Sequence, residues 1–283
     1  MTKKIAVIND LSGFGRCSLT AAISVIAAMG VQPCPLPTAI LSAQTGYPSY
    51  YYDDYTDKME LIYRQWDKME ARFDGIYTGF MSGERQVRKA AEFADLFCRK
   101  DTFLLVDPIM GDNGERFSFV TAGMRAEVKA LASRADIITP NLTELCLLTG
   151  TDYRMVGEMT EKKHLVTAAE QMAGNMIAAG TKEVVVTGIR YKDENNGAEM
   201  MANFAVTGEA TFLSACPFIG ESYSGTGDLF ASVIAGGKAR GNKLSDTVQL
   251  AGEMITRAVE ESVKNQVPRN EGVDYEKYLG MVM

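Results

Sequence analysis

Hydrophobic and polar positions along the chain alternate between short β-branched apolar runs and longer stretches with helical spacing. The first apolar run covers residues 4–8, and an apolar helical stretch over residues 17–29 follows it. Short apolar runs separated by helices are typical of βαβ units, in which crossover helices join parallel strands. The pattern therefore predicts an α/β protein with a Rossmann-like, mostly parallel central sheet and helices on both faces.

The same alternation continues along most of the chain. Further strands are predicted at residues 34–41, 75–78, 103–107, 136–139 and 183–187, and further helices at residues 58–72, 85–99, 123–133 and 165–179. Two short antiparallel strands, at residues 202–206 and 210–215, and two helices, near residues 228–239 and 245–263, complete the pattern. Because no linker and no internal repeat interrupts it, we expect a single domain over residues 1–283.

Composition and charge narrow the classes of function. A net charge of -7 disfavours a broad basic surface for nucleic acid. The five cysteines form no C-x-x-C pair and the chain has one histidine, so a zinc site is not expected and reduced thiols fit the cytosol. The longest apolar segment, residues 19–31, is too short to span a bilayer. We expect a soluble cytoplasmic protein without a membrane or nucleic-acid partner.

The most informative motif is Gly225-Thr226-Gly227-Asp228, which stands at the head of an apolar helical run. Glycines at a helix N-terminus leave free backbone N–H groups accessible, and the helix dipole favours an anion there. Asp228, in the first turn, is short enough to accept a proton from a hydroxyl beside that anion site. The alternative is an N-cap aspartate that follows a flexible loop.

The only histidine, His164, lies in a charged stretch that opens a helix, and we expect it on the surface. A mechanism that needs a Ser-His or Cys-His pair is therefore disfavoured, which leaves carboxylates as the natural acid–base groups.

Polar residues also follow other predicted strands. Asp107 ends one strand and leads into a loop containing Gly111, and Asn141 and Glu144 follow the next strand. Ligands of parallel α/β sheets bind beyond the carboxyl ends of the strands, and acidic groups beside a phosphate commonly hold Mg²⁺. A Pro/Gly turn at Asp107 and a capping box between Asn141 and Glu144 are the structural alternatives.

Two familiar nucleotide motifs do not fit. The segment Gly13-Phe14-Gly15-Arg16-Cys17-Ser18 lacks the third glycine of the dinucleotide fingerprint, so a nicotinamide cofactor and a dehydrogenase are weakly supported. No G-x-x-x-x-G-K-[ST] sequence occurs, which disfavours a P-loop ATPase.

Taken together, the segments at Asp107, at Asn141 to Glu144 and at Gly225 to Asp228 resemble the ribokinase-like superfamily of small-molecule kinases, and within it the pyridoxal kinases. The segment starting at Asp107 is similar to the family's D-P-[VI]-M-G motif. Asn141 to Glu144 is similar to its N-x-x-E motif, and Gly225 to Asp228 is similar to its G-x-G-D anion hole. The resemblance covers nearly the whole chain.

The resemblance implies ATP as phosphoryl donor and Mg²⁺ as cofactor, and it leaves a K⁺ requirement open. It implies that Asp228 is the catalytic base, beside the anion hole of Gly225, Thr226 and Gly227. The implied ATP contacts are Asp107, Thr139, Asn141, Glu144 and Thr187, with Asp107 and Glu144 also at the metal. Many pyridoxal kinases have lysine where Thr187 stands, so a neutral hydroxyl would contact the phosphates here.

The resemblance also implies where the acceptor binds. Together with Asp228, the implied substrate-binding residues are Ser12, Gln44, Thr45, Gly46 and Phe80. Phe80 stands where tyrosine is often found, so ring packing is expected without the polar contact of a tyrosine hydroxyl.

The reaction implied is phosphorylation of the 5′-hydroxyl of pyridoxal, pyridoxine or pyridoxamine, by a homodimer. Because Ala43-Gln44-Thr45 is also similar to hydroxymethylpyrimidine kinases, that pyrimidine is an alternative substrate. A regulator that binds a vitamer or nucleotide without turnover is the alternative from another class.

Overall fold

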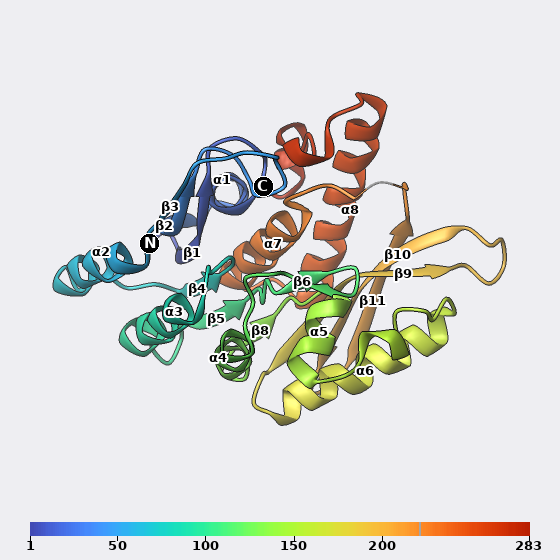
Figure 1. Cartoon of the computed structure of the whole chain (residues 1–283), viewed down its shortest axis with the longest axis horizontal. Coiled ribbons are helices and arrows are strands. Elements are labelled where there is room, and N and C mark those ends of the chain that lie inside the picture. Colours follow the sequence, from blue (N-terminus) through green and yellow to red (C-terminus); the bar gives the residue numbers. More distant parts are fainter. Residues whose placement is uncertain (221) are drawn as a thin grey trace. The chain divides into compact units, whose positions relative to one another are not determined.

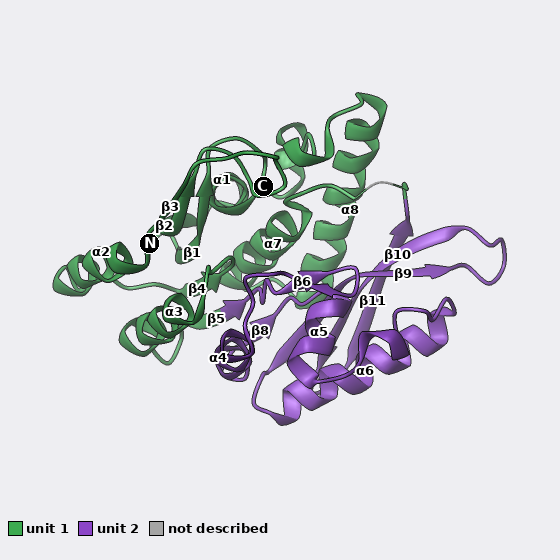
Figure 2. Cartoon of the chain, viewed as in Figure 1, with its two compact units in different colours: residues 1–104, 219–283 green, residues 105–218 purple. Residues whose placement is uncertain are grey.

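The computed structural model describes residues 1–220 and 222–283. Its contacts divide the chain into two compact units, shown in Figure 2. Unit 1 comprises Met1–Leu104 and Ile219–Met283, and unit 2 comprises Leu105–Phe218. The expectation of one domain over residues 1–283 stays a prediction.

In unit 1 a sheet runs in the order β4-β1-β2-β3 (Figure 1). Its strands are β1 (Lys4–Ser12), β2 (Gln32–Leu41), β3 (Tyr52–Asp54) and β4 (Gly75–Thr78). β1 pairs in parallel with β2 and β4, and β3 is antiparallel to β2. The central β1 is buried along most of its length, as a parallel strand covered on both faces must be.

The helices of unit 1 cover this sheet. They are α1 (Ser18–Ala28), α2 (Thr56–Lys68), α3 (Glu84–Phe97), α7 (Thr226–Arg240) and α8 (Leu244–Lys264), followed by the short 3₁₀ helices η2 (Arg269–Glu271) and η3 (Glu276–Met281). α1 and α7 pack on β1, and α8 packs on α7, whereas α2 packs on β2 and α3. The crossover through α1 leads from β1 to β2, whereas the one through α2 leads back past β1 to β4, in the opposite direction across the sheet. Because both connections are expected to be right-handed, the two helices belong on opposite faces.

In unit 2, β5 pairs in parallel with β8, and β8 with β9, before β10 and β11 continue in antiparallel fashion. These strands are β5 (Phe103–Val106, of which Leu105 and Val106 belong to unit 2), β8 (Ile137–Ile138), β9 (Glu183–Lys192), β10 (Glu199–Thr207) and β11 (Thr211–Pro217). The remaining elements are the hairpin of β6 (Gly111–Asp112) and β7 (Glu115–Arg116), the helices α4 (Ala122–Ala132), α5 (Leu142–Thr149) and α6 (Lys162–Ala178), and η1 (Tyr153–Met155).

The predicted α/β class with mostly parallel strands is confirmed, and each predicted strand and helix has a counterpart. β9 extends beyond the predicted end at Thr187, because Gly188 takes φ +68 and its N–H donates to Asn203 Oδ1. The pairing of β9 with β10 shifts register there, so a glycine that reads as a strand end is a β-bulge instead. β3 and the β6–β7 hairpin were not predicted, since two or three residues carry no readable periodicity.

Across the described residues, no helix is both long and apolar enough to cross a membrane.

Candidate active site

The Gly225 turn begins α7 in unit 1. Gly225 takes φ +81, and a Cβ atom at this position would overlap the carbonyl oxygen of Arg16. Only glycine satisfies both constraints. Gly227 is exposed and a Cβ there would meet open space, so the backbone of the first turn of α7 is open to a ligand. This geometry suits an anion at the N-terminus of a 15-residue helix.

Asp228 lies in the first turn of α7 and is 8% exposed. Burial raises the pKa of Asp228 to about 6, and the nearby carboxylate of Asp10 acts in the same direction. Hydrogen bonds from the Ser18 backbone and the Asn9 side chain oppose that rise, because they favour the ionised form. The result is a carboxylate that is ionised near neutral pH and basic enough to accept a proton.

Asn9 fixes the orientation of Asp228 from the end of β1. Its Oδ1 accepts the N–H groups of Phe80, at 2.8 Å, and Asp10, at 3.0 Å. Its Nδ2 must therefore point the other way, and it donates to Asp228 Oδ1 at 2.9 Å. With Asn9 fully buried, one oxygen of Asp228 has a permanent donor.

Asp10 and Ser12 lie beside this contact. The Ser12 hydroxyl donates to Asp10 Oδ2 at 2.7 Å, and Ser18 also donates a side-chain hydrogen bond to Asp10. Burial raises the pKa of Asp10, and these two hydroxyl groups lower it. We call Asn9, Asp10, Ser12, Ser18 and Asp228 the Asp228 group; it joins residues from β1, α1 and α7.

Cys17 is buried against the same group. Burial, followed by the charges of Asp228 and Asp10, raises the pKa of the Cys17 thiol to about 12. A thiol in this state is protonated and unreactive at neutral pH. Among the described residues all five cysteines are free. The single histidine, His164, is exposed and lies 3.2 Å from Glu161, as expected of a surface residue.

The predicted acceptor residues lie in unit 1, at the end of β1 and on the loops after β2 and β4. Ser12 is buried, while Thr45 and Gly46 are exposed. Phe80 is half-buried, and its backbone is held on both sides, by Asn9 through its N–H and by Thr38 Oγ1 through its carbonyl at 2.9 Å. The structure thus brings Ser12 and the Phe80 backbone to the Asp228 group.

The predicted nucleotide residues come together in unit 2. Asn141 caps α5: its side chain accepts the N–H of Glu144 and Glu144 accepts the N–H of Asn141, each at 2.9 Å. This capping box was one of the alternatives considered from the sequence, and the structure contains it. Thr139 Oγ1 donates to Asp107 Oδ1 at 2.9 Å. The half-buried Thr187 forms an isolated bridge to Asn141.

Glu144 also reaches the loop after β5, where its Oε1 accepts the N–H of Met110 at 3.1 Å. Burial raises the pKa of Glu144 well above its usual range, and the neighbouring carboxylate of Asp107 adds to the effect. We call Asp107, Thr139, Asn141 and Glu144 the Glu144 group. Two buried carboxylates close together favour a cation between them.

Within the described residues, no cluster of three or more His, Cys, Asp or Glu side chains could hold a metal ion by itself. The oxygen-only donors of Asp107 and Glu144 nevertheless match the preference of Mg²⁺, which commonly takes one or two carboxylates and completes its shell with phosphate and water oxygens. The donor set of unit 2 fits a magnesium ion that arrives with a nucleotide.

Sequence reasoning did not assign Asn9, Asp10 or Ser18 to the site. Asn9 and Asp10 carried one signal, their place at the end of the first strand. Ser18 carried none: it takes φ +52, unusual for a residue other than glycine, and it directs both its N–H and its hydroxyl toward the two aspartates.

The parallel α/β architecture, with a glycine turn and a buried aspartate at the start of a late helix, defines a ribokinase-like small-molecule kinase. Within this class, the chain belongs to the phosphomethylpyrimidine kinase family, whose model matches residues 15–272. The expected membership in the pyridoxal kinase family, and the expectation of an enzyme, are also confirmed by the following relatives.

The pyridoxal kinase PdxY of Rubrobacter xylanophilus is 27% identical over 92% of this chain and 88% of its own length. A Bacteroides thetaiotaomicron structure, described as a phosphomethylpyrimidine kinase and solved with pyridoxal, is 33% identical with a TM-score of 0.90. That match covers 100% of this chain and 96% of the other. The pyridoxal kinase of Lactobacillus plantarum is 25% identical with a TM-score of 0.86, over 100% of this chain and 97% of its own.

Proposed function

We propose that this kinase transfers the γ-phosphoryl group of ATP to the 5′-hydroxyl of pyridoxal, pyridoxine or pyridoxamine. The observation that carries the proposal is the Asp228 carboxylate. It is buried, oriented by Asn9, poised with a pKa of about 6, and placed in the first turn of α7 next to an open glycine backbone. The pyridoxal bound to the Bacteroides relative supports the choice of acceptor.

Asp228 acts as the general base. As the acceptor oxygen attacks the γ-phosphorus, the hydroxyl proton passes to Asp228, the new O–P bond forms, and the bond to the β-phosphate oxygen breaks to release ADP. Asn9 Nδ2 and the Ser18 N–H hold the Asp228 carboxylate in one orientation, and this carboxylate receives the proton. The N–H groups of Gly225, Thr226 and Gly227 stabilise the charge on the phosphoryl oxygens.

The other predicted residues take the roles that the resemblance implies. Ser12, Thr45, Gly46 and Phe80 contact the acceptor, whereas the predicted contact Gln44 uses its amide within the protein. The Glu144 group and Thr187 hold the nucleotide, with Asp107 and Glu144 binding Mg²⁺, which supplies charge neutralisation on the phosphates when bound. A homodimer, a cytoplasmic location and any need for K⁺ stay predictions.

One assay tests the proposal: release of ADP from ATP and Mg²⁺ with pyridoxal, pyridoxine, pyridoxamine, hydroxymethylpyrimidine and ribose, each offered separately. We expect turnover with the three B6 vitamers. Greater turnover with hydroxymethylpyrimidine would move the substrate to the pyrimidine alternative. Saturable vitamer binding in calorimetry without ADP release would indicate a non-catalytic regulator, and activity on ribose alone would overturn the proposal.

A further inference from the structure

Gln44 does not keep its amide free for a ligand. Its Nε2 donates to the carbonyl oxygen of Asn270 at 3.0 Å and to Ser224 Oγ at 3.3 Å, and its Oε1 accepts the N–H of Gly46 at 2.7 Å. Gln44 is 8% exposed. An amide NH₂ group has two hydrogens, and both are used within the protein. Gln44 therefore connects the loop after β2 to two distant parts of the chain.

Asn270 holds the same loop from the other side. Its Nδ2 donates to the carbonyl oxygen of Gly46 at 2.7 Å. A Cβ atom on Gly46 would lie 2.7 Å from Asn270 Oδ1 and 2.8 Å from Gln44 Nε2, so the two amides enclose the backbone at this position. Side chains thus bind both the N–H and the C=O of Gly46, and a glycine is required for their close approach.

Asn270 belongs to a short C-terminal segment that also holds the Gly225 turn. We call residues 269–276 the strap. The carbonyl oxygen of Arg269 accepts the N–H of Ser224 at 3.1 Å. Gly272 takes φ +78, and a Cβ atom there would lie 3.1 Å from the carbonyl oxygen of Ser224. The strap is therefore in contact with the residue that precedes Gly225.

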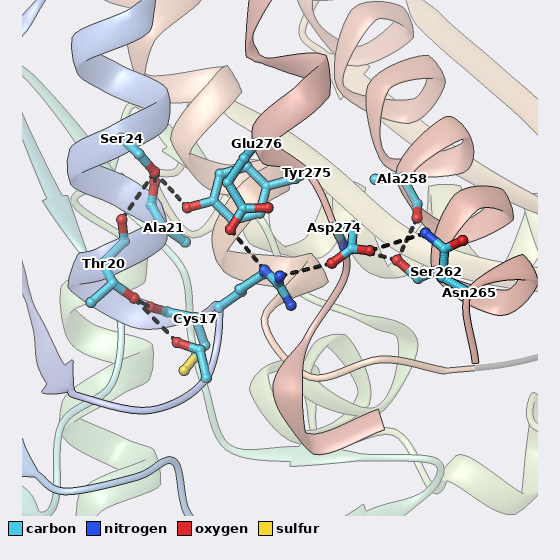
Figure 3. Close-up of polar contacts among 12 residues, drawn as sticks. Cys17, Thr20, Ala21, Ser24, Ala258, Ser262, Asn265, Asp274, Tyr275 and Glu276 are labelled. Carbon is cyan, nitrogen blue, oxygen red and sulfur yellow. Dashed lines mark hydrogen bonds and ion pairs between the residues drawn. The ribbon is translucent and has the colours of Figure 1, made fainter. Parts of the chain in front are cut away.

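The strap is fixed in turn to the start of α1. The N–H of Arg16 donates to the carbonyl oxygen of Glu271 at 2.9 Å, and its guanidinium binds Asp274 and Glu276, each at 2.7 Å. Figure 3 shows Tyr275 and Glu276 beside α1, where the Tyr275 and Ser24 hydroxyls lie 2.6 Å apart, and Asp274 beside Ser262 and Asn265 at the C-terminal end of α8. Several independent contacts therefore hold the strap, so its position does not depend on Asn270 alone.

We propose that the strap sets the position of the acceptor loop, residues 44–46, against the Gly225 turn, with Gln44 and Asn270 as its pair of positioning residues. This inference rests on the proposed function for its kinetic effects. Gln44 then acts on the acceptor through the loop backbone rather than by a direct contact. The strap holds Thr45 and Gly46 in one conformation before the acceptor binds, so less conformational entropy is lost on binding.

The test is a double-mutant cycle with Gln44→Ala and Asn270→Ala, and exposed Asn242→Ala as the control. Each single variant is expected to raise KM for pyridoxal about tenfold and to leave KM for ATP and the pH profile unchanged, and the double variant to show the same tenfold rise. A rise near a hundredfold in the double variant would show that the two residues act independently and would overturn the inference.

A second pair of variants tests whether Gln44 positions the loop or contacts the substrate directly. Gln44→Glu and Asn270→Asp keep the side-chain volume and lose the donated hydrogen bonds, so they serve even where alanine variants fold poorly. Positioning predicts that both leave the preference for pyridoxal over hydroxymethylpyrimidine unchanged. A changed preference in Gln44→Glu, with none in Asn270→Asp, would make Gln44 a substrate contact.

Hydrogen exchange tests the strap without reference to catalysis. The amide of Gly46 is expected to exchange at least tenfold faster in Asn270→Asp than in the parent protein, while exchange in the Asn242→Ala control stays unchanged. Unchanged exchange at Gly46 would refute the role of Asn270. If the parent protein released no ADP with any vitamer, the proposed function would fail while this measurement would still decide the inference.

Discussion

The Asp228 group of unit 1 and the Glu144 group of unit 2 both hold a buried carboxylate whose pKa is raised by burial. They hold it by different means. Glu144 is bonded to Asn141 within one helical turn, and Met110 is 34 residues away. Asp228 depends on Asn9, 219 residues away, and on Ser18.

The charges beside the two buried carboxylates also differ. The charge of Asp107 raises the pKa of Glu144 more than the hydrogen bond from Asn141 or from Met110 lowers it. In contrast, the hydrogen bond from the Ser18 N–H lowers the pKa of Asp228 more than the charge of Asp10 raises it. Two adjacent buried carboxylates attract a cation, and a buried carboxylate with oriented hydrogen-bond donors accepts a proton. This contrast supports the proposal that unit 2 binds the ion and that Asp228 of unit 1 accepts the proton.

The largest effect expected is that of Asp228→Asn, which removes the base while keeping volume and one acceptor for Asn9. We expect kcat to fall by about two to four orders of magnitude with KM for ATP nearly unchanged, measured by steady-state ADP release. Asp246→Asn, in the exposed first turn of α8, is the matched control. Near-normal turnover of Asp228→Asn would exclude Asp228 as the base.

Glu144→Gln is expected to act on the nucleotide instead. The neutral amide weakens the attraction for Mg²⁺, so kcat/KM for ATP should fall about 10- to 100-fold while KM for pyridoxal changes little. Titrations of both substrates and of Mg²⁺ measure this, with exposed Glu170→Gln on α6 as control. A rise confined to KM for pyridoxal would remove the distinction between the two groups.

The pH dependence of kcat/KM for pyridoxal should report Asp228, because kcat/KM follows the pKa values of the free enzyme. Its pKa of about 6 is raised above the usual value for aspartate, so the base is protonated, and inactive, as pH falls through 6. From pH 7 to pH 5 kcat/KM for pyridoxal should therefore drop about tenfold. The residual activity of Asp228→Asn should lack this acid limb; if the limb persisted there, another group would be responsible for it.

Asn141→Ala should have the smallest effect, because it removes only the cap of α5 and one bond to Gly111. We expect about 1 kcal/mol of lost stability in denaturant unfolding. Thr121→Ala is the matched control, because it likewise removes the N-terminal side-chain cap of a helix, α4. Both variants should lose similar stability, and only Asn141→Ala should raise KM for ATP. Equal KM values would leave Asn141 a purely structural cap.

The difference between the two groups also explains how far sequence reasoning reached. The capping box of Asn141 and Glu144 was visible because, at a helix N-terminus, two such side chains three residues apart can each accept the backbone N–H of the other residue. Gly225 to Asp228 was visible as a glycine turn before an apolar helix. Asn9 was visible only as a polar residue at a strand end, because its partners Phe80 and Asp228 come from other elements.

By itself the sequence determined the alternation of strands and helices, the caps, and the residue types of the candidate site. These depend on neighbours within a few positions, so periodicity and turn chemistry record them. Only the tertiary structure decided that Asn9 and Ser18 bind Asp228, that burial raises its pKa, and that the Gln44 amide is used by Asn270 and Ser224. Such contacts follow from strand order, register and burial, which bring together residues that are distant along the chain.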